Sequence, residues 1–365
     1  MERFSAIWKL SWTGTPAVYT YLNLTSNTKT NTAFDFISAT TNYFYFGSSK
    51  RFIGIYCDLS TNGSYSGVTY EYFDGDDWNP LSLIDSYNWN ESKYVRWLLP
   101  DRWQKYNFTE EEPHITTTLP DTSERYWVRV GVTGYTTTAV ISKIRSIPYC
   151  AYTSPTNVSE FLQLKNDFNS STRPTDLAVE NLIRRAEDYI DYRTRKSFKF
   201  NVVSETTDPQ LTDYNRYGVF LRHRNFYKVY SVSLWNGSAW DTLTEGRNND
   251  YFVNYDLGLI YFTRLFLLPA AYGMTGRYFL WGYGEYKNSV KVDYIYGRDI
   301  ETVPAEFYIV EDLATKMASV DLLRHTDYSN LTVSGTDKVP LESKIRLLEE
   351  QIEQRLDELT GIAVY

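Results

Sequence analysis

The sequence predicts an α+β multidomain protein: an N-terminal antiparallel β-sandwich, then a helical domain with an inserted small antiparallel sheet and a C-terminal amphipathic helix. One observation is composition, because 33 Tyr, 10 Trp and 19 Phe in 365 residues favour strands and a large core. Another is periodicity: apolar and polar residues alternate over residues 4–149, and helical spacing begins only afterwards. A chain of this length supports two domains, which we expect at residues 1–150 and 151–365.

The charge balance argues against duplex DNA as a ligand. Lys and Arg number 37 against 45 Asp and Glu, so the net charge is -8, whereas affinity for phosphates needs a basic surface. The first residues lack a basic segment followed by an apolar core, and no apolar run is long enough to span a bilayer. We therefore expect neither an export signal nor a membrane segment. Cys57 and Cys150 are too few for a disulfide framework or a zinc site, so both are expected to be reduced.

The predicted sandwich rests on short alternating runs separated by Gly, Asn, Asp and Ser, the clearest at residues 52–56, 68–73 and 126–132. Roughly eight such strands would fit. Asp74-Gly75 predicts a tight hairpin between the run that ends at Phe73 and Trp78, because these residue types tolerate positive φ.

The same order of residues occurs a second time, far downstream. Phe73 and Trp235 are each followed at identical spacing by Asp-Gly or Asn-Gly, then by a Trp and then by a Leu. Tight hairpins with a cross-strand aromatic pair select this pattern independently, so we favour two separate hairpins over a duplicated domain.

Helical patterns begin after residue 150. Asn157 and Glu160 predict a capping box for a helix over 157–168, and Asp176 is expected to cap a longer helix over 176–196. The period then returns to two, which predicts inserted strands between residues 218 and 297, in runs at 229–235, 251–255, 259–262, 277–280 and 290–296.

Two more helices are expected near the C-terminus. Pro304, in a first helical turn, opens a helix over 303–325, and a polar loop over 326–340 separates it from a last helix over 341–359. The last helix is amphipathic, and a helix joined by a long loop needs a surface to pack on. A neighbouring subunit could supply that surface.

The search for catalytic chemistry finds no motif. His114, His223 and His325 lie in separate segments without a second ligand at metal-binding spacing, so each is expected to be a surface or loop residue. The run from Asp74 to Asp77 lacks the alternating ligands and closing Glu of a calcium loop, and a hairpin turn explains it better. No nucleophile elbow, phosphate loop or dinucleotide fingerprint occurs. We therefore expect no enzymatic activity, no catalytic residue, no cofactor and no metal.

One basic cluster stands out on the predicted helix over 176–196. A solvated face with intrahelical acidic partners is one interpretation, and a docking surface for an acidic partner subunit is the other. The candidate interface residues are Arg184, Arg185, Arg193 and Arg195.

Residues 157–359 resemble the head-tail connector, or adaptor, proteins of tailed bacteriophages, which form a ring beneath the portal. The resemblance is carried by an ordered set of segments and covers a little over half of the chain. These segments are the helix from Asp176 to the Lys196-Ser-Phe198 exit, the hairpin segments 228–240 and 249–262, the strand 290–297, and the helix that opens at Val303-Pro304. The first 150 residues depart from the family, since small adaptors lack them.

The resemblance implies a structural protein of the virion neck, assembled in the host cytoplasm, that joins the DNA-filled head to the tail. It implies a cyclic homo-oligomer of about twelve copies, with the portal protein and a tail or tail-completion protein as partners. DNA would pass, during ejection, through an acidic and non-adhesive channel without sequence-specific binding. The sandwich would then face outward, toward capsid or fibre proteins.

The resemblance also assigns roles to the last helix, which orders on assembly in this family. Its apolar stripe would dock on the portal through Leu341, Ile345, Leu348, Ile352, Leu356 and Leu359. Its acidic face would line the channel or an interface through Glu349, Glu350, Glu353, Asp357 and Glu358.

A carbohydrate-binding or fibre-type sandwich protein with no ring function is the alternative. In that case exposed tryptophans would stack on sugar rings, and the candidates are Trp89, Trp97, Trp103 and Trp127. Their even distribution along the chain favours core packing instead.

Overall fold

The computed structural model describes most of the chain and divides it into two compact units. The described residues are 3–13, 18–107, 123–208, 210–211, 217–223, 226–235, 238–246, 248–255, 258–263, 288–298, 304–324 and 341–361. One unit comprises Met1–Asp188 with Glu311–Gln354, and the other comprises Tyr189–Val310 with Arg355–Tyr365. The predicted domains, residues 1–150 and 151–365, stay a prediction.

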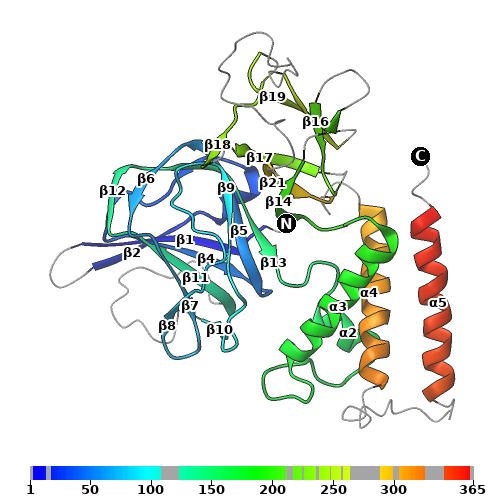
Figure 1. Ribbon diagram of the computed structural model, residues 1–365. Helices are drawn as coiled ribbons and strands as arrows, with labels where there is room; N and C mark the ends of the chain where they lie inside the picture. The colour runs from blue at the N-terminus through cyan, green and yellow to red at the C-terminus, as the bar shows by residue number, and fades with distance from the viewer. Residues whose placement is uncertain are drawn as a thin grey trace. The chain divides into compact units, whose positions relative to one another are not determined.

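The first unit contains a mostly antiparallel β-structure (Figure 1). A seven-stranded sheet has the order β2-β1-β4-β11-β7-β8 with β10 on β11, a four-stranded sheet has the order β3-β13-β5-β9, and β12 pairs with β6. The strands are β1 (Ala6–Thr13), β2 (Val18–Asn23), β3 (Phe34–Asp35), β4 (Tyr43–Ser48), β5 (Phe52–Thr61), β6 (Ser64–Ser66), β7 (Thr69–Phe73), β8 (Trp78–Pro80), β9 (Lys93–Arg96), β10 (Lys105–Tyr106), β11 (Arg125–Gly131), β12 (Gly134–Thr137) and β13 (Val140–Pro148).

The two larger sheets share one apolar core, as in a sandwich. Phe44, Phe46 and Val128 come from the seven-stranded sheet, and Ile55 and Ile144 come from the four-stranded sheet; all five are fully buried. This arrangement follows from the period of two, which places alternate side chains of each strand on the same face. The predicted sandwich therefore has its expected core, built largely of aromatic and β-branched residues.

The seven-stranded sheet is apolar on its second face as well. Trp8, Tyr45 and Trp127 form a separate buried cluster there, and the rings of Trp8 and Trp127 lie 4.6 Å apart. Arg129 lies over the ring of Trp78 at 4.6 Å. Both faces of this sheet therefore bury aromatic side chains.

The predicted Asp74-Gly75 hairpin is confirmed. Phe73 pairs with Trp78 across β7 and β8, and Gly75 has a φ of 114°, which favours glycine. Asp74 Oδ1 accepts hydrogen bonds from the backbone N–H groups of Asp76 and Asp77, each at 2.9 Å. The Asp74 carboxylate thus closes the turn, as the hairpin interpretation requires.

The predicted bounds of α2 are wrong, whereas α3 begins at the predicted residue and only its predicted cap is wrong. Helix α2 runs over Pro155–Phe161, not 157–168: Ser154 is its N-cap and accepts from the backbone N–H of Asn157, and Gln163 has a φ of 54° that ends it. Helix α3 runs over Asp176–Thr194, and the Thr175 hydroxyl, not Asp176, accepts from the backbone N–H of Ala178 at 3.2 Å. A short helix α1 (Thr25–Thr30) was not predicted.

Helix α3 is held to the sandwich by buried charges within the first unit. Arg51 Nη1 lies 2.9 Å from both Asp176 Oδ2 and Glu180 Oε2, and its guanidinium lies 4.6 Å above the ring of Tyr126. Two turns later in α3, the Glu187 carboxylate accepts hydrogen bonds from the backbone N–H groups of Ala151 and Tyr152 at 2.6 and 2.7 Å, next to an apolar core that includes Val179 and Ile183. Such buried, charge-assisted contacts fix the position of α3.

The second unit contains two four-stranded sheets with the orders β14-β21-β17-β18 and β15-β16-β20-β19. Their buried core includes Val219, Val232, Ile260, Val292 and Tyr294. The sequence predicted one small sheet, and the predicted strand runs did not include β14, β15 or β16. The predicted strand at 277–280 lies outside the described residues. The strands are β14 (Asn201–Thr207), β15 (Gln210–Leu211), β16 (Tyr217–Phe220), β17 (Phe226–Trp235), β18 (Trp240–Thr242), β19 (Tyr251–Asn254), β20 (Leu259–Phe262) and β21 (Val290–Tyr296).

Helices α4 (Pro304–Arg324) and α5 (Leu341–Gly361) match the expected last two helices within two residues. The predicted loop over 326–340 lies outside the described residues. Among the residues that the structure describes, no helix is long and apolar enough to cross a membrane.

Candidate functional site

The apolar stripe of α5 divides into a partly exposed half and a buried half. Ile345 and Leu348 are half-buried, whereas Ile352, Leu356 and Leu359 are at most 7% exposed. The side chain of Leu341 is outside the description. The stripe therefore offers its first half, and not its second, to another molecule.

The predicted acidic face of α5 is largely solvent-exposed and partly paired. Glu349 pairs with Arg324, Glu350 Oε1 lies 3.2 Å from Arg346 Nε, and Glu358 Oε2 lies 2.7 Å from Arg355 Nη1. Exposed pairs of this kind contribute little to stability. Glu353 and Asp357 are also exposed.

The basic cluster of α3 separates into two environments. Arg184 has intrahelical partners, since its guanidinium lies 3.8 Å from Glu187 and 3.6 Å from Asp188, while Arg185 is exposed. Arg193 and Arg195 lie at the other end of the helix, where they line a pocket.

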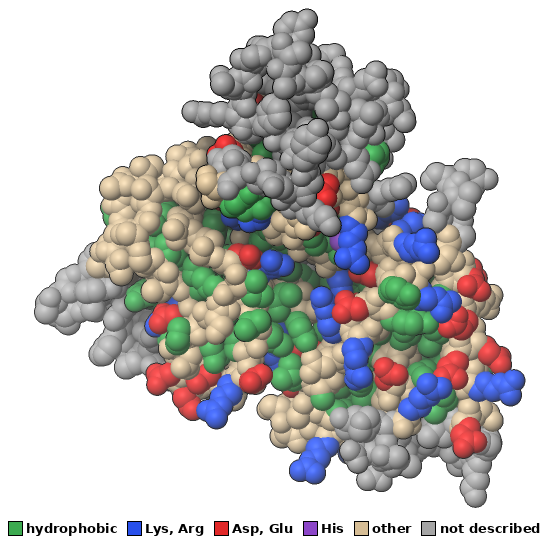
Figure 2. All heavy atoms as spheres, viewed as in Figure 1, with side chains coloured by type: hydrophobic (Ala, Val, Ile, Leu, Met, Phe, Trp, Pro, Cys, Tyr) green, Lys and Arg blue, Asp and Glu red, His purple; other side chains and the backbone are tan. Residues whose placement is uncertain are grey.

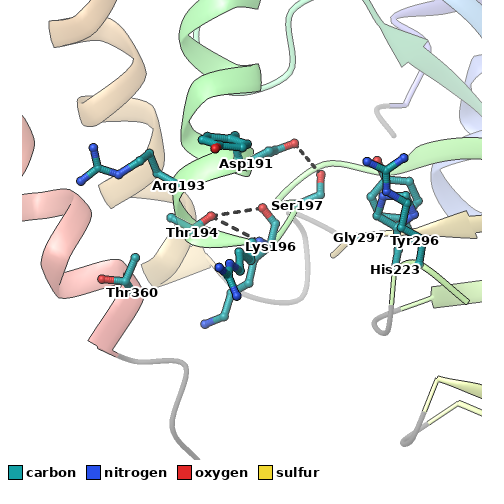
Figure 3. Close-up of a pocket in the computed structure, with 12 residues that line it drawn as sticks. Asp191, Arg193, Thr194, Lys196, Ser197, His223, Tyr296, Gly297 and Thr360 are labelled. Atoms are coloured by element: carbon teal, nitrogen blue, oxygen red, sulfur yellow. Dashed lines mark hydrogen bonds between the residues drawn. The ribbon is translucent and has the colours of Figure 1, made fainter. Parts of the chain in front are cut away.

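This pocket lies within the second unit and has a volume of about 1090 Å³. Arg193, Arg195 and Lys196 line it at the end of α3, and Arg222 and His223 line it just after β16. In Figure 3 the Lys196 side chain extends into the open space, with Thr360 to one side and His223 beside Tyr296 to the other. In Figure 2 a Lys or Arg side chain lies directly beside the small visible part of the His. Two segments thus bring basic side chains to one cavity.

Basic side chains outnumber acidic ones among the residues that line the pocket. Asp191 is the single carboxylate among the lining residues, and its Oδ2 accepts a hydrogen bond from the Ser197 hydroxyl at 3.0 Å. Arg193 Nη1 donates to the Tyr189 hydroxyl at 2.8 Å. The structure gives the side chains of Arg195 and Lys196 no ion pair with any residue that it describes.

His223 is held by two tyrosines and a glutamate. Its ring stacks on Tyr296 with centroids 3.7 Å apart, and its Nδ1 lies 2.9 Å from the hydroxyl of Tyr294. That hydroxyl donates to Glu205 at 3.0 Å, so it accepts from Nδ1–H and leaves Nε2 as the site of protonation. Burial lowers the pKa of His223, Glu205 opposes this and the neighbouring Arg222 adds to it.

This arrangement can bind anions, because convergent cations in a concave site concentrate positive potential. Among the described residues, no group of His, Cys, Asp and Glu has the geometry of a metal site. Sequence reasoning found Arg193 and Arg195 but missed Arg222, His223 and Tyr296. Only the Arg222-His223 pair was a local signal, and nothing in the sequence joined it to α3.

The tryptophans proposed for sugar stacking are unavailable to a ligand. Trp89, Trp97, Trp103 and Trp127 are each at most 1% exposed, so core packing is confirmed for all four.

No protein-family model and no curated protein matches the chain. Among solved structures, the chain is similar to one titled "Neck of empty GTA particle computed with C6 symmetry", with 13% identity, 54% of this chain and 89% of that chain covered, and a TM-score of 0.28. It is also similar to a family 89 glycoside hydrolase from Clostridium perfringens, with 11% identity, 45% and 20% coverage and a TM-score of 0.14. Both TM-scores are too low to support an argument about function.

Proposed function

We propose that this chain is a structural protein of the virion neck, a ring subunit beneath the portal that joins the head to the tail of a phage-like particle. The observation that carries the proposal is the order of elements α3, β17–β18, β19–β20, β21, α4 and α5. This is the order in which the connector resemblance places its helices and inserted hairpins. The proposal includes no catalytic activity.

Exposed apolar side chains on the helices support an assembly role. Tyr192 is 78% exposed on α3, Tyr308 is 68% exposed on α4 and Leu347 is 55% exposed on α5. Tyrosine is enriched at protein interfaces because its ring contributes contact area and its hydroxyl contributes a hydrogen bond. Each helix could therefore contribute to contacts between neighbouring copies, which in a ring are heterologous.

The burial pattern of α5 indicates which of its apolar residues would dock on the portal. Ile352, Leu356 and Leu359 are buried, so they anchor the helix in its own chain. Ile345 and Leu348 are only half-buried and lie on the same stripe, so they would meet the portal. Deletion of the whole helix would consequently remove core residues, and it cannot separate docking from folding.

The remaining parts of the proposal concern partners. The net charge of -8 suits a channel through which DNA moves without adhesion. The sandwich would contact capsid or fibre proteins, and the opposite face of the ring would meet a tail protein. These assignments place the protein in the virion, after assembly in the host cytoplasm.

Substitutions on α5 test the docking role. We expect Ile345→Glu with Leu348→Glu to abolish co-sedimentation with the portal protein from the same genome, because two carboxylates cannot be desolvated in an apolar contact. Ser343→Glu with Lys344→Gln, at exposed positions of the same helix, changes the net charge by the same amount; it is the matched control and should leave co-sedimentation intact. Full binding by the double variant, with an unchanged far-ultraviolet circular dichroism spectrum, would contradict the docking role.

A further inference from the structure

The basic pocket at the end of α3 is exceptional on an acidic chain. Arg195, Lys196 and Arg222 line it, and the structure shows no ion pair between their side chains and any described residue. Like charges in one cavity repel one another, and an anion that enters relieves that repulsion. The pocket is therefore suited to bind an anionic ligand.

The backbone conformation at the end of α3 also places cationic residues at the pocket. Arg195 follows the last helical residue with a φ of 53°, a conformation in which glycine is the usual residue and a larger side chain is strained. Lys196 comes directly after it. The turn thus directs two successive cations to the pocket at a conformational cost that a glycine would avoid.

Several donors surround the cavity from two segments. Arg195 and Lys196 follow α3, whereas Arg222 and His223 follow β16. Each guanidinium offers a fork of N–H donors, and the ammonium offers three more. The Tyr294 hydroxyl accepts from His223 Nδ1, so Nε2 becomes an additional donor when the ring is protonated.

We propose that this pocket binds a phosphate group, either free phosphate or the phosphate of a nucleic-acid backbone. A phosphate presents acceptor oxygens in a tetrahedral arrangement and can accept from both segments at once. A carboxylate presents two oxygens in one plane and matches a single guanidinium fork better. The inference does not depend on ring formation.

The pKa of His223 can be used to detect phosphate in the pocket. Glu205 and Arg222 act on the charge of His223, the Tyr294 hydroxyl lies on Nδ1, and Asp191, Arg195 and Lys196 line the same pocket. A phosphate dianion in the pocket stabilises the imidazolium and should raise the pKa of His223. The chain has only three histidines, so the ring can be followed by NMR after selective labelling and assigned with His223→Gln.

The test titrates inorganic phosphate into the full-length protein at constant ionic strength, against chloride. We expect saturable binding, a rise in the pKa of His223, and a loss of affinity of about tenfold or more in the triple variant R195Q/K196Q/R222Q. The matched triple variant R185Q/K344Q/R346Q removes the same charge from exposed helix positions and should stay within about twofold of the wild type. Far-ultraviolet circular dichroism shows whether each variant is folded.

Competition with an oligonucleotide then distinguishes the two possible sources of the phosphate group. A short oligonucleotide that displaces phosphate assigns the site to a nucleic-acid backbone, and one that does not assigns it to free phosphate or a small phosphoester. Three results would overturn the proposal: a His223 signal that phosphate does not move, equal losses in the two triple variants, or a Glu-rich peptide that binds the pocket where phosphate does not. The last result would assign the pocket to an acidic protein segment.

Discussion

Replacement of Arg51 by methionine should strongly destabilise the first unit. Arg51 lies 2.9 Å from both Asp176 and Glu180, and the side-chain exposures of Arg51 and Glu180 are 8%. Methionine preserves much of the apolar volume but leaves two carboxylates without their counter-ion. Loss of one partner from a buried pair costs about 3–5 kcal/mol, so we expect the free energy of unfolding to fall by that amount at neutral pH.

The pH dependence of this loss supplies a second test. Burial raises the pKa of the Glu180 carboxyl while Arg51 lowers it, so Arg51→Met should raise that pKa further. Between the unfolded and folded pKa values the folded state binds more protons, and the free energy of unfolding therefore falls as pH rises. The cost of Arg51→Met should thus be small below the ordinary glutamate pKa and complete only above the folded value.

Chemical denaturation across a pH series measures both effects. Arg96→Met is the control, since Arg96 Nε lies 2.8 Å from Asp85 Oδ2 but both side chains are about one quarter exposed. That variant should lose less than about 1 kcal/mol at any pH. A loss in Arg51→Met no larger than in the control, or one that does not change with pH, would refute the conclusion that this ion pair joins α3 to the sandwich.

Three further predictions concern single residues. Glu187→Gln removes the charge from two short backbone hydrogen bonds, and thermal denaturation should show a loss of about 1.5–3 kcal/mol; a change below about 0.5 kcal/mol would contradict this role. Gly297→Ala places a Cβ against the Lys199 carbonyl oxygen at a φ of 106°, so a stability loss of about 2 kcal/mol or more is expected, and neutral behaviour would disprove the close approach. NMR should show that the pKa of His223 lies below the ordinary histidine pKa. The contribution of neutral His223 to the free energy of unfolding is therefore present above the ordinary pKa and declines as pH falls through the lowered pKa. Arg222→Gln should raise the pKa of His223, and an unchanged pKa would contradict the proximity of the two side chains.

Local patterns in the sequence were sufficient to predict most of the strands, hairpins and helices. The Asp74-Gly75 turn and the alternation in β11 specify their conformations within a few residues, so the sequence predicts them directly. Strand β14 was missed because Asn201–Thr207 is rich in Ser, Thr and Glu, and only Val202 in it is buried. The start of α2 carried a readable signal, since Ser154-Pro155 is itself a cap followed by a first-turn proline.

Long-range charge pairing could not be predicted in the same way. Arg51 and Glu180 are 129 residues apart, and no spacing rule relates them. Arg222 reaches the end of α3 only because the second unit folds its strands between them. Half of the basic pocket was therefore visible in the sequence, as Arg193 and Arg195, and the other half became visible only in the structure.

An image of the purified protein with its portal tests the central claim most directly. The proposed function predicts that negative-stain electron microscopy of the mixture shows cyclic rings of this chain, stacked coaxially on the portal around an open channel. Particles of the portal alone beside a monodisperse monomer, over a range of protein and salt concentrations, would contradict the assignment of this chain to the virion neck.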